Sequence, residues 1–127
     1  DAAAVVLYAG AIAWVIFYDT IYAHQDREDD VLIGIKSTAR LFGARTHAAL
    51  MAFGTLTVVL IGAALAMAGA GVPAFAGLAG FAVHLAWQVR ALDIDDPAGC
   101  LRLFKSNRDA GLILFAGLAV DAVLRAL

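Results

Sequence analysis

The lengths of two uncharged apolar runs constrain this chain most. Residues 2 to 18 contain no Asp, Glu, Lys or Arg, and neither do residues 46 to 89. At a helical rise of about 1.5 Å per residue, the longer run extends roughly 66 Å, enough for two crossings of a hydrocarbon layer about 30 Å thick. Hydrophobic residues make up 63% of the chain and its mean hydropathy is +0.85, outside the range of a small soluble domain. We therefore expect an all-α fold, a multi-pass transmembrane helix bundle.

The apolar runs divide into about four expected transmembrane helices. The first covers residues 2 to 18 and continues toward residue 23. A glycine-rich break ending at Pro73 splits the long run into helices at 47 to 69 and 73 to 92. Residues 93 to 109 are expected to form a polar loop, followed by a last span at 110 to 127. On that span Asp121 and Arg125 lie four residues apart and are expected to pair.

Carboxylates are concentrated where the first expected span ends. If the helix continues at about 100° per residue, Asp26 lies roughly 20° from Asp19, and Asp30 lies roughly 40° further round. Carboxylates this close repel one another unless a cation sits between them, and a hard divalent ion prefers oxygen ligands. Mg²⁺ is usually held by one or two carboxylates plus substrate phosphates, so Asp26 and Asp30, supported by Asp19, predict a magnesium half-site for a diphosphate. The alternative is a solvated acidic helix end, but the position beside a membrane-length run favours a functional site.

Cationic residues follow the carboxylates. Residues 31 to 46 mix apolar and basic residues and predict a short amphipathic segment in the membrane interface. Lys36 is the best nearby point charge for a diphosphate, with an ordinary interfacial lysine as the alternative. Arg27, Lys105 or Arg108 could also contact diphosphate or carboxylate oxygens.

Several other side chains permit two interpretations. Trp14, Tyr18 and Tyr22 recur every four residues, which predicts an aromatic belt at the membrane interface, or alternatively a surface that stacks on an isoprenoid or an aromatic acceptor. For His84, in the middle of a span, a helix-to-helix hydrogen bond is favoured over a ligand role. The single Cys100 is expected to pack in the core.

Two stretches resemble a known family. Residues 19 to 39 read D-T-x-Y-A-x-x-D-x-x-D-D-x-x-x-G-x-K-S-T-A and resemble the second aspartate-rich motif of the UbiA superfamily of intramembrane prenyltransferases, most closely its 4-hydroxybenzoate polyprenyltransferases. Residues 93 to 111, DIDDPAGCLRLFKSNRDAG, resemble the loop that enters the last helix of that family. The family has roughly nine transmembrane helices and a first aspartate-rich motif, which nothing here matches. We therefore expect residues 1–127 to be the C-terminal part of a single integral-membrane prenyltransferase domain, inactive without the upstream half of the same enzyme.

The resemblance implies a reaction and a set of site residues. A polyprenyl group would pass from polyprenyl diphosphate to the aromatic ring of 4-hydroxybenzoate, in ubiquinone biosynthesis, with Mg²⁺ as the cofactor. Metal binding is expected at Asp26, Asp30 and Asp19, with Lys36 completing the catalytic set. Arg27 and Asn107 are further candidate ligand contacts. Asn107 would either orient a metal-bound water or cap the last helix, and its residue type favours the cap.

Other functions and partners are also constrained by the sequence. Related acceptors, namely homogentisate, a naphthoate or a chlorophyllide, remain alternatives, as does a non-enzymatic fragment that transports cations. Cation-transport sites usually lie near the membrane midplane, whereas these carboxylates lie at an interface. With a net charge of −2, nucleic acid is not an expected partner. Eight of the nine Lys and Arg residues lie between residues 27 and 108, so the positive-inside rule places the motif loops on the cytoplasmic or matrix side of a bacterial or mitochondrial inner membrane.

Overall fold

The computed structural model describes residues 1–25 and 45–127, which form four helices. They are α1 (Ala2–Gln25), α4 (Thr46–Met67), α5 (Val72–Ala91) and α6 (Pro97–Ala126). Three of them, α1, α4 and α5, are long and apolar enough to cross a membrane. The expected all-α membrane bundle is therefore confirmed, with α6 as a fourth helix outside that apolar class. The expected amphipathic segment at residues 31 to 46 falls almost entirely outside the described residues.

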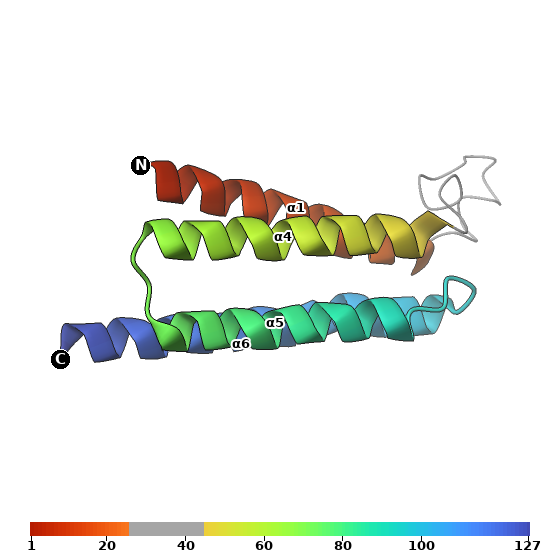
Figure 1. Cartoon of the computed structure of the whole chain (residues 1–127). Coiled ribbons are helices and arrows are strands. Elements are labelled where there is room, and N and C mark those ends of the chain that lie inside the picture. Colours follow the sequence, from red (N-terminus) through yellow and green to blue (C-terminus); the bar gives the residue numbers. More distant parts are fainter. Residues whose placement is uncertain (26–44) are drawn as a thin grey trace.

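The helices alternate in direction, which gives the bundle two distinct ends (Figure 1). The turn between α4 and α5 lies at one end, together with both chain ends; we call it the far end. The end of α1, the start of α4 and residues 92–96 lie at the other, which we call the site end. There the Nε2 atom of His47 lies 3.0 Å from the carbonyl oxygen of Leu92, a contact that joins the start of α4 to the connection between α5 and α6.

Gly69 makes the tight turn at the far end. Its φ of 72° is a left-handed conformation that glycine adopts without steric cost. The Gly69 N–H donates to the Ala66 carbonyl at 3.1 Å, and the Ala70 N–H donates to the Leu65 carbonyl at 2.9 Å. These two bonds satisfy carbonyls that the end of α4 would otherwise leave unpaired. The break expected from the glycine-rich segment is confirmed, and Pro73 lies in the first turn of α5.

The expected polar loop at residues 93 to 109 is wrong, because α6 already begins at Pro97. The Asp96 side chain caps the helix by accepting from the Gly99 N–H at 3.1 Å. The charged residues that suggested a loop, Arg102 and Lys105, lie on the exposed face of the first turns. Leu103 and Asn107 on the opposite face are buried, so the segment is an amphipathic helix rather than a loop.

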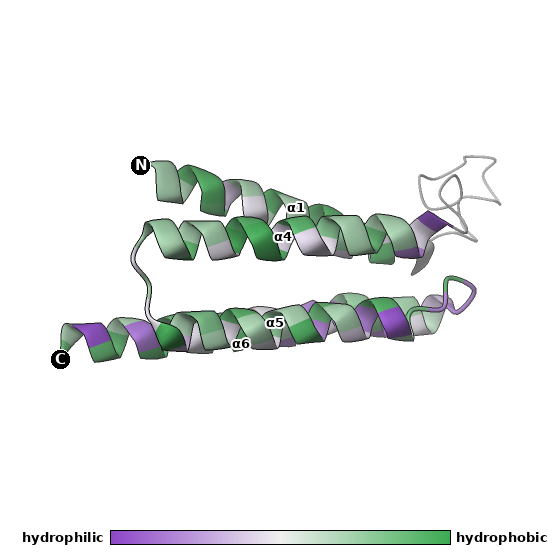
Figure 2. Ribbon diagram, viewed as in Figure 1, coloured by the Kyte–Doolittle hydropathy of each residue, from purple (hydrophilic) through white to green (hydrophobic). Residues whose placement is uncertain are grey.

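The helices pack most closely as two pairs, α1 with α4 and α5 with α6. Within the second pair, a Cβ atom added to Gly117 would lie 2.5 Å from the Gly77 Cα, so the two backbones meet without side chains between them. Phe17, Leu50 and Phe81 are among the fully buried core side chains. Figure 2 shows hydrophobic residues along α4, with hydrophilic residues near its start and around residues 92–96.

Candidate functional site

The predicted site residues fall into two groups. Asp19 lies on an exposed face of α1, near the site end, and makes no ion pair with the residues that the structure describes. Asp26, Arg27, Asp30 and Lys36 lie outside the described residues. Within residues 1–25 and 45–127, no group of three or more His, Cys, Asp or Glu side chains could hold a metal ion. The magnesium site therefore stays a prediction.

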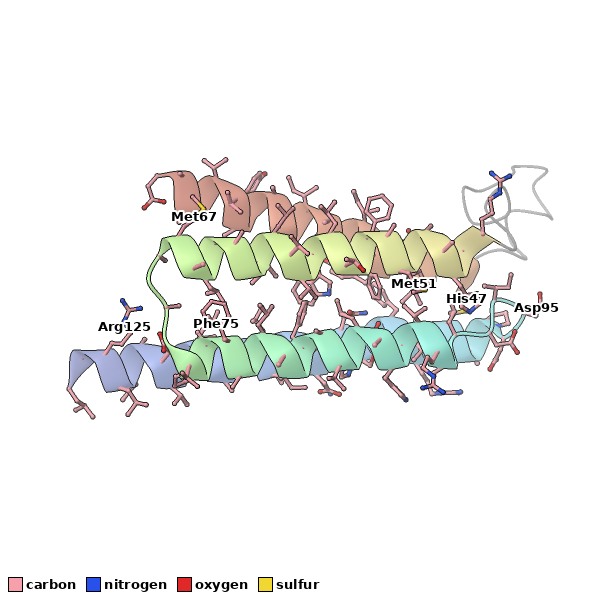
Figure 3. All side chains as sticks on the ribbon, in the orientation of Figure 1. His47, Met51, Met67, Phe75, Asp95 and Arg125 are labelled. Atoms are coloured by element: carbon pink, nitrogen blue, oxygen red, sulfur yellow. The ribbon has the colours of Figure 1, made fainter. Side chains whose placement is uncertain are left out.

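The acidic side chains of residues 92–96 hold the chain in its turn at the site end. Figure 3 shows Asp95 and His47 at this end of the bundle and Arg125 at the far end. The Asp93 carboxylate accepts from the Asp95 N–H at 2.9 Å, and Asp96 caps α6. Cys100 is fully buried and its thiol donates to the Asp93 carbonyl at 3.4 Å, which confirms its expected place in the core. These interactions give the segment a structural role.

Cationic side chains lie near the site end on α5 and α6. Arg90, Arg102 and Lys105 are exposed. Arg108 also points to the outside and lies 3.7 Å from Asp109, with both side chains mostly exposed. An exposed ion pair of this kind contributes little to stability. Arg90 on α5 and Lys105 on the neighbouring α6 are therefore accessible to anionic ligands.

Four polar side chains, from α1, α5 and α6, form a hydrogen-bonded group that we call the amide network. Its members are Trp14, His84, Gln88 and Asn107. The Trp14 indole N–H donates to the Asn107 side-chain oxygen at 3.1 Å. The Gln88 and Asn107 amides bond each other in both directions, at 3.1 Å each way. Gln88 Nε2 also lies 2.9 Å from His84 Nδ1.

The amide network corrects two sequence predictions. Asn107 does not cap α6, because it lies within the helix, is 7% exposed and bonds to Gln88, while Asp96 provides the cap. Its predicted contact with a ligand stays a prediction. His84 bonds to Gln88 one turn along the same helix, and Gln88 rather than His84 makes the bond between helices.

Several aromatic residues of α1 pack against neighbouring helices: Phe17 is buried and Trp14 and Tyr18 are half-buried, whereas Tyr8 is exposed. Trp14 packs edge-on against Phe81 of α5 at 5.2 Å between ring centroids. Tyr18 and Tyr22 both contact Phe104 of α6, at 5.7 Å and 4.7 Å. Trp14 and Tyr18 thus contact other helices, and the expectation of an interfacial belt stays a prediction. These ring contacts pack α1 against α5 and α6.

An apolar cavity of about 460 Å³ lies between α4 and α5, and Phe17 of α1 also contributes to its lining. Phe17, Leu50 and Leu85 are among its lining residues, and Arg90 is the charged residue in that lining. Such a cavity suits hydrocarbon, and the guanidinium suits an anionic group attached to it. The described residues therefore offer apolar walls and exposed cations, while the predicted carboxylates of residues 26 and 30 follow α1 directly in the sequence.

Sequence reasoning missed most of the amide network. His84 and Gln88 are uncharged polar residues one helical turn apart within an apolar span, a signal that marks an interior face. Their partners could not be found this way, because Trp14 and Asn107 are separated by 93 positions and only the packing of α1 against α6 brings them together.

Comparisons with known proteins identify the family. Residues 1–117 match the model of the UbiA prenyltransferase family. The chain is 44% identical over 119 residues to a 4-hydroxybenzoate polyprenyltransferase, mitochondrial, of Caenorhabditis elegans, covering 94% of this chain and 33% of that protein. Proteins of the same name from Mus musculus and Homo sapiens are 44% and 42% identical over 114 residues, covering 90% of this chain and 30% and 31% of theirs.

These matches also set the extent of the similarity. The chain spans about a third of the length of the curated relatives it matches. No solved structure matches it. The family match covers nearly the whole chain and agrees with the helical fold, and the relatives are more than 40% identical over most of it. The chain belongs to the UbiA prenyltransferase family.

Proposed function

We propose that this chain forms part of an enzyme that transfers a polyprenyl group from polyprenyl diphosphate to a ring carbon of 4-hydroxybenzoate, in ubiquinone biosynthesis. The observation that carries the proposal is its 44% identity to proteins named 4-hydroxybenzoate polyprenyltransferase, over at least nine-tenths of the chain. The helices upstream of this region in the relatives would supply the rest of the site. Because those relatives are named mitochondrial, an inner membrane is the proposed location, with the site end on the matrix or cytoplasmic side.

The proposed Mg²⁺ would be held by Asp26 and Asp30, with Asp19 in support. The donor set fits this ion, since carboxylate oxygens are the protein ligands that Mg²⁺ prefers. When bound, the ion neutralises diphosphate charge and so favours departure of the diphosphate from the allylic carbon. Asp19 itself is exposed near the site end and has no partner among the described residues that would compete for its carboxylate.

The remaining roles fall to the chain's own side chains. The cavity beside Phe17 and Leu85 would hold part of the isoprenoid tail and exclude water from the developing allylic cation. Lys36, Arg27 and the exposed Lys105 would bind oxygens of the diphosphate or of the aromatic acid. The ring carbon ortho to the hydroxyl would then attack the allylic carbon, and the ring would lose a proton.

The test uses membranes that contain the full-length protein, a radiolabelled polyprenyl diphosphate and Mg²⁺. We expect labelled prenylated 4-hydroxybenzoate from the wild type, a loss of at least roughly a hundredfold in Asp26→Ala and Asp30→Ala, and none after chelation. Asp109→Ala is the matched control, since it removes an exposed carboxylate from α6. Equal product in all variants would refute the site. Product only with homogentisate, a naphthoate or a chlorophyllide would keep the chemistry and change the acceptor.

A further inference from the structure

The donor and the acceptor of each hydrogen bond in the amide network can be assigned, starting from Trp14. We call this assignment the direction of the network. An indole N–H can only donate a hydrogen bond. Trp14 must therefore meet an acceptor, so the Asn107 oxygen rather than its nitrogen faces α1. Amide oxygen and nitrogen atoms are hard to distinguish by shape alone, but a donor-only neighbour decides between them.

A second group fixes the same orientation independently. Asn107 Nδ2 lies 3.3 Å from the Leu103 carbonyl oxygen and 3.1 Å from that of Phe104. Backbone carbonyls can only accept, so the nitrogen must face them. Trp14 on one side and the α6 carbonyls on the other therefore both exclude a flipped Asn107.

The same assignment of donors and acceptors extends from Asn107 through Gln88 to His84. The Asn107 oxygen accepts one N–H from Trp14 and another from Gln88, which fills both of its lone pairs. Gln88 Nε2 has one N–H left, and that N–H points to His84 Nδ1 at 2.9 Å. Nδ1 must be the acceptor, so the ring proton of His84 is on Nε2. Gln88 is fully buried, so it cannot exchange these partners for water.

We propose that Trp14, Gln88 and Asn107 are positioning residues that fix the axial register of α1 against α5 and α6 and hold His84 as its Nε2–H tautomer. The proposal rests on the proposed function, in which α1 leads to the metal-binding carboxylates. Trp14 lies five residues before Asp19 on α1, and Asn107 lies two residues after Lys105 on α6. The bond between Trp14 and Asn107 therefore sets the distance along the bundle axis between Asp19 and Lys105.

Hydrogen bonds are suited to this role because apolar contacts are not directional. The ring contact of Trp14 with Phe81 depends less strictly on the positions of individual atoms than a hydrogen bond does. In a lipid environment, a shift that breaks the Trp14–Asn107 bond leaves buried polar groups without water to replace their partners. The network therefore adds a directional constraint on the register to the constraint that packing supplies.

Histidine ¹⁵N NMR on the labelled full-length protein tests the direction of the network. We expect the wild type to show a protonated Nε2 and a bare Nδ1 at His84. In Gln88→Glu, an acceptor-only carboxylate faces His84, so the proton should move to Nδ1. Trp87→Phe is the control, because it changes a ring that touches His84 edge-on and leaves every hydrogen bond of the amide network in place, so the Nε2–H form should persist. A wild type with the proton on Nδ1, or a Gln88→Glu variant without the change, overturns the proposal.

Kinetics test the positioning role. Trp14→Phe keeps an aromatic ring but removes the indole N–H donor together with part of the ring, and Trp87→Phe makes the same change at a half-exposed ring that touches His84 edge-on without a hydrogen bond. Per folded enzyme, we expect kcat to fall roughly tenfold in Trp14→Phe with KM for the diphosphate nearly unchanged, and neither to change in Trp87→Phe. A purely structural role would lower the amount of folded protein and leave kcat unchanged.

The two arms separate the possible failures. Product from the wild type, with equal kcat in Trp14→Phe and Trp87→Phe, overturns the positioning role and keeps the proposed function. An expected NMR result from a wild type that forms no prenylated product overturns the proposed function and keeps the fixed direction of the network.

Discussion

Asp121 is buried at the far end, on a helix whose other charged side chains are mostly exposed. It is 4% exposed, and its carboxylate accepts from the Gly71 N–H at 3.0 Å and from Arg125 at 3.4 Å. The pairing with Arg125 was predictable from the four-residue spacing and is confirmed. The bond to Gly71 was not predictable, because it joins α6 to a turn 50 positions away. It attaches the start of α5 to the last turns of α6.

Replacing Asp121 with alanine should therefore destabilise the protein. The change leaves the part-buried Gly71 N–H without its acceptor, which costs about 1–3 kcal/mol of unfolding free energy. Asp121→Asn keeps an oxygen for that N–H and should lose less. Asp109→Ala removes an exposed carboxylate and should change stability by less than about 0.5 kcal/mol. Thermal unfolding of the full-length protein in detergent measures all three, and equal stabilities in Asp121→Ala and Asp109→Ala would contradict the assignment.

Among the elements, α6 shows most clearly where sequence reasoning succeeds and fails. Its apolar second half was recognisable as a helix, but its first half was taken for a loop because Arg102, Lys105 and Arg108 dominate its composition. Their spacing of three residues places them on one side of a helix, and Pro97 after a capping Asp96 marks the start. Period and capping were better guides to the boundary than charge content.

The α5–α6 contact predicts a sharp difference between two glycines. A Cβ on Gly77 would lie 2.8 Å from the Gly117 Cα and 3.2 Å from the Leu114 carbonyl oxygen, so Gly77→Ala must push two backbones apart. We expect a loss of about 1–3 kcal/mol. At Gly62 the nearest contact is the Leu78 side chain at 3.3 Å, which can move, and alanine favours a helix by up to about 1 kcal/mol. Chemical or thermal unfolding should rank Gly62→Ala at or above the wild type; equal losses in both variants would refute the close backbone contact.

At the scale of the whole molecule, the sequence predicted the class of fold but only part of the site. Uncharged runs of membrane length leave few choices, so three helices and the turn at Gly69 were predictable from composition and spacing. The packing of the aromatic residues of α1 and the amide network were not predictable. The same residue types occur both at a membrane interface and on an interior helix face, and only their neighbours in the structure distinguish the two. Trp14 and Asn107 needed the packed bundle to be recognised as partners.

The arrangement predicts which segments share a side of the membrane. In a cysteine-free full-length protein, Asp95→Cys at the site end and Ala68→Cys at the far end should react with a membrane-impermeant maleimide from opposite sides. Both positions are exposed and lie in or beside a connection. By the positive-inside rule, Asp95→Cys should react from the cytoplasmic or matrix side. Labelling of both from one side would contradict a bundle in which α5 crosses the membrane.

A small change of angle at the far-end turn would cause a larger displacement at the site end, because the helices that meet at the turn are long. The closely packed pairs, α1 with α4 and α5 with α6, are joined in sequence by residues 68–71, and Asp121 pins that joint to α6. A helix of 20 residues is about 30 Å long, so a rotation of roughly 5° at the joint displaces the opposite end by roughly 2.6 Å. A rotation at this turn therefore produces a displacement that grows along the length of the helices, so a rigid turn limits the displacement at the site end. By fixing the turn against α6, the Asp121 carboxylate therefore contributes, from the end opposite the proposed chemistry, to how accurately the helices meet at the site end.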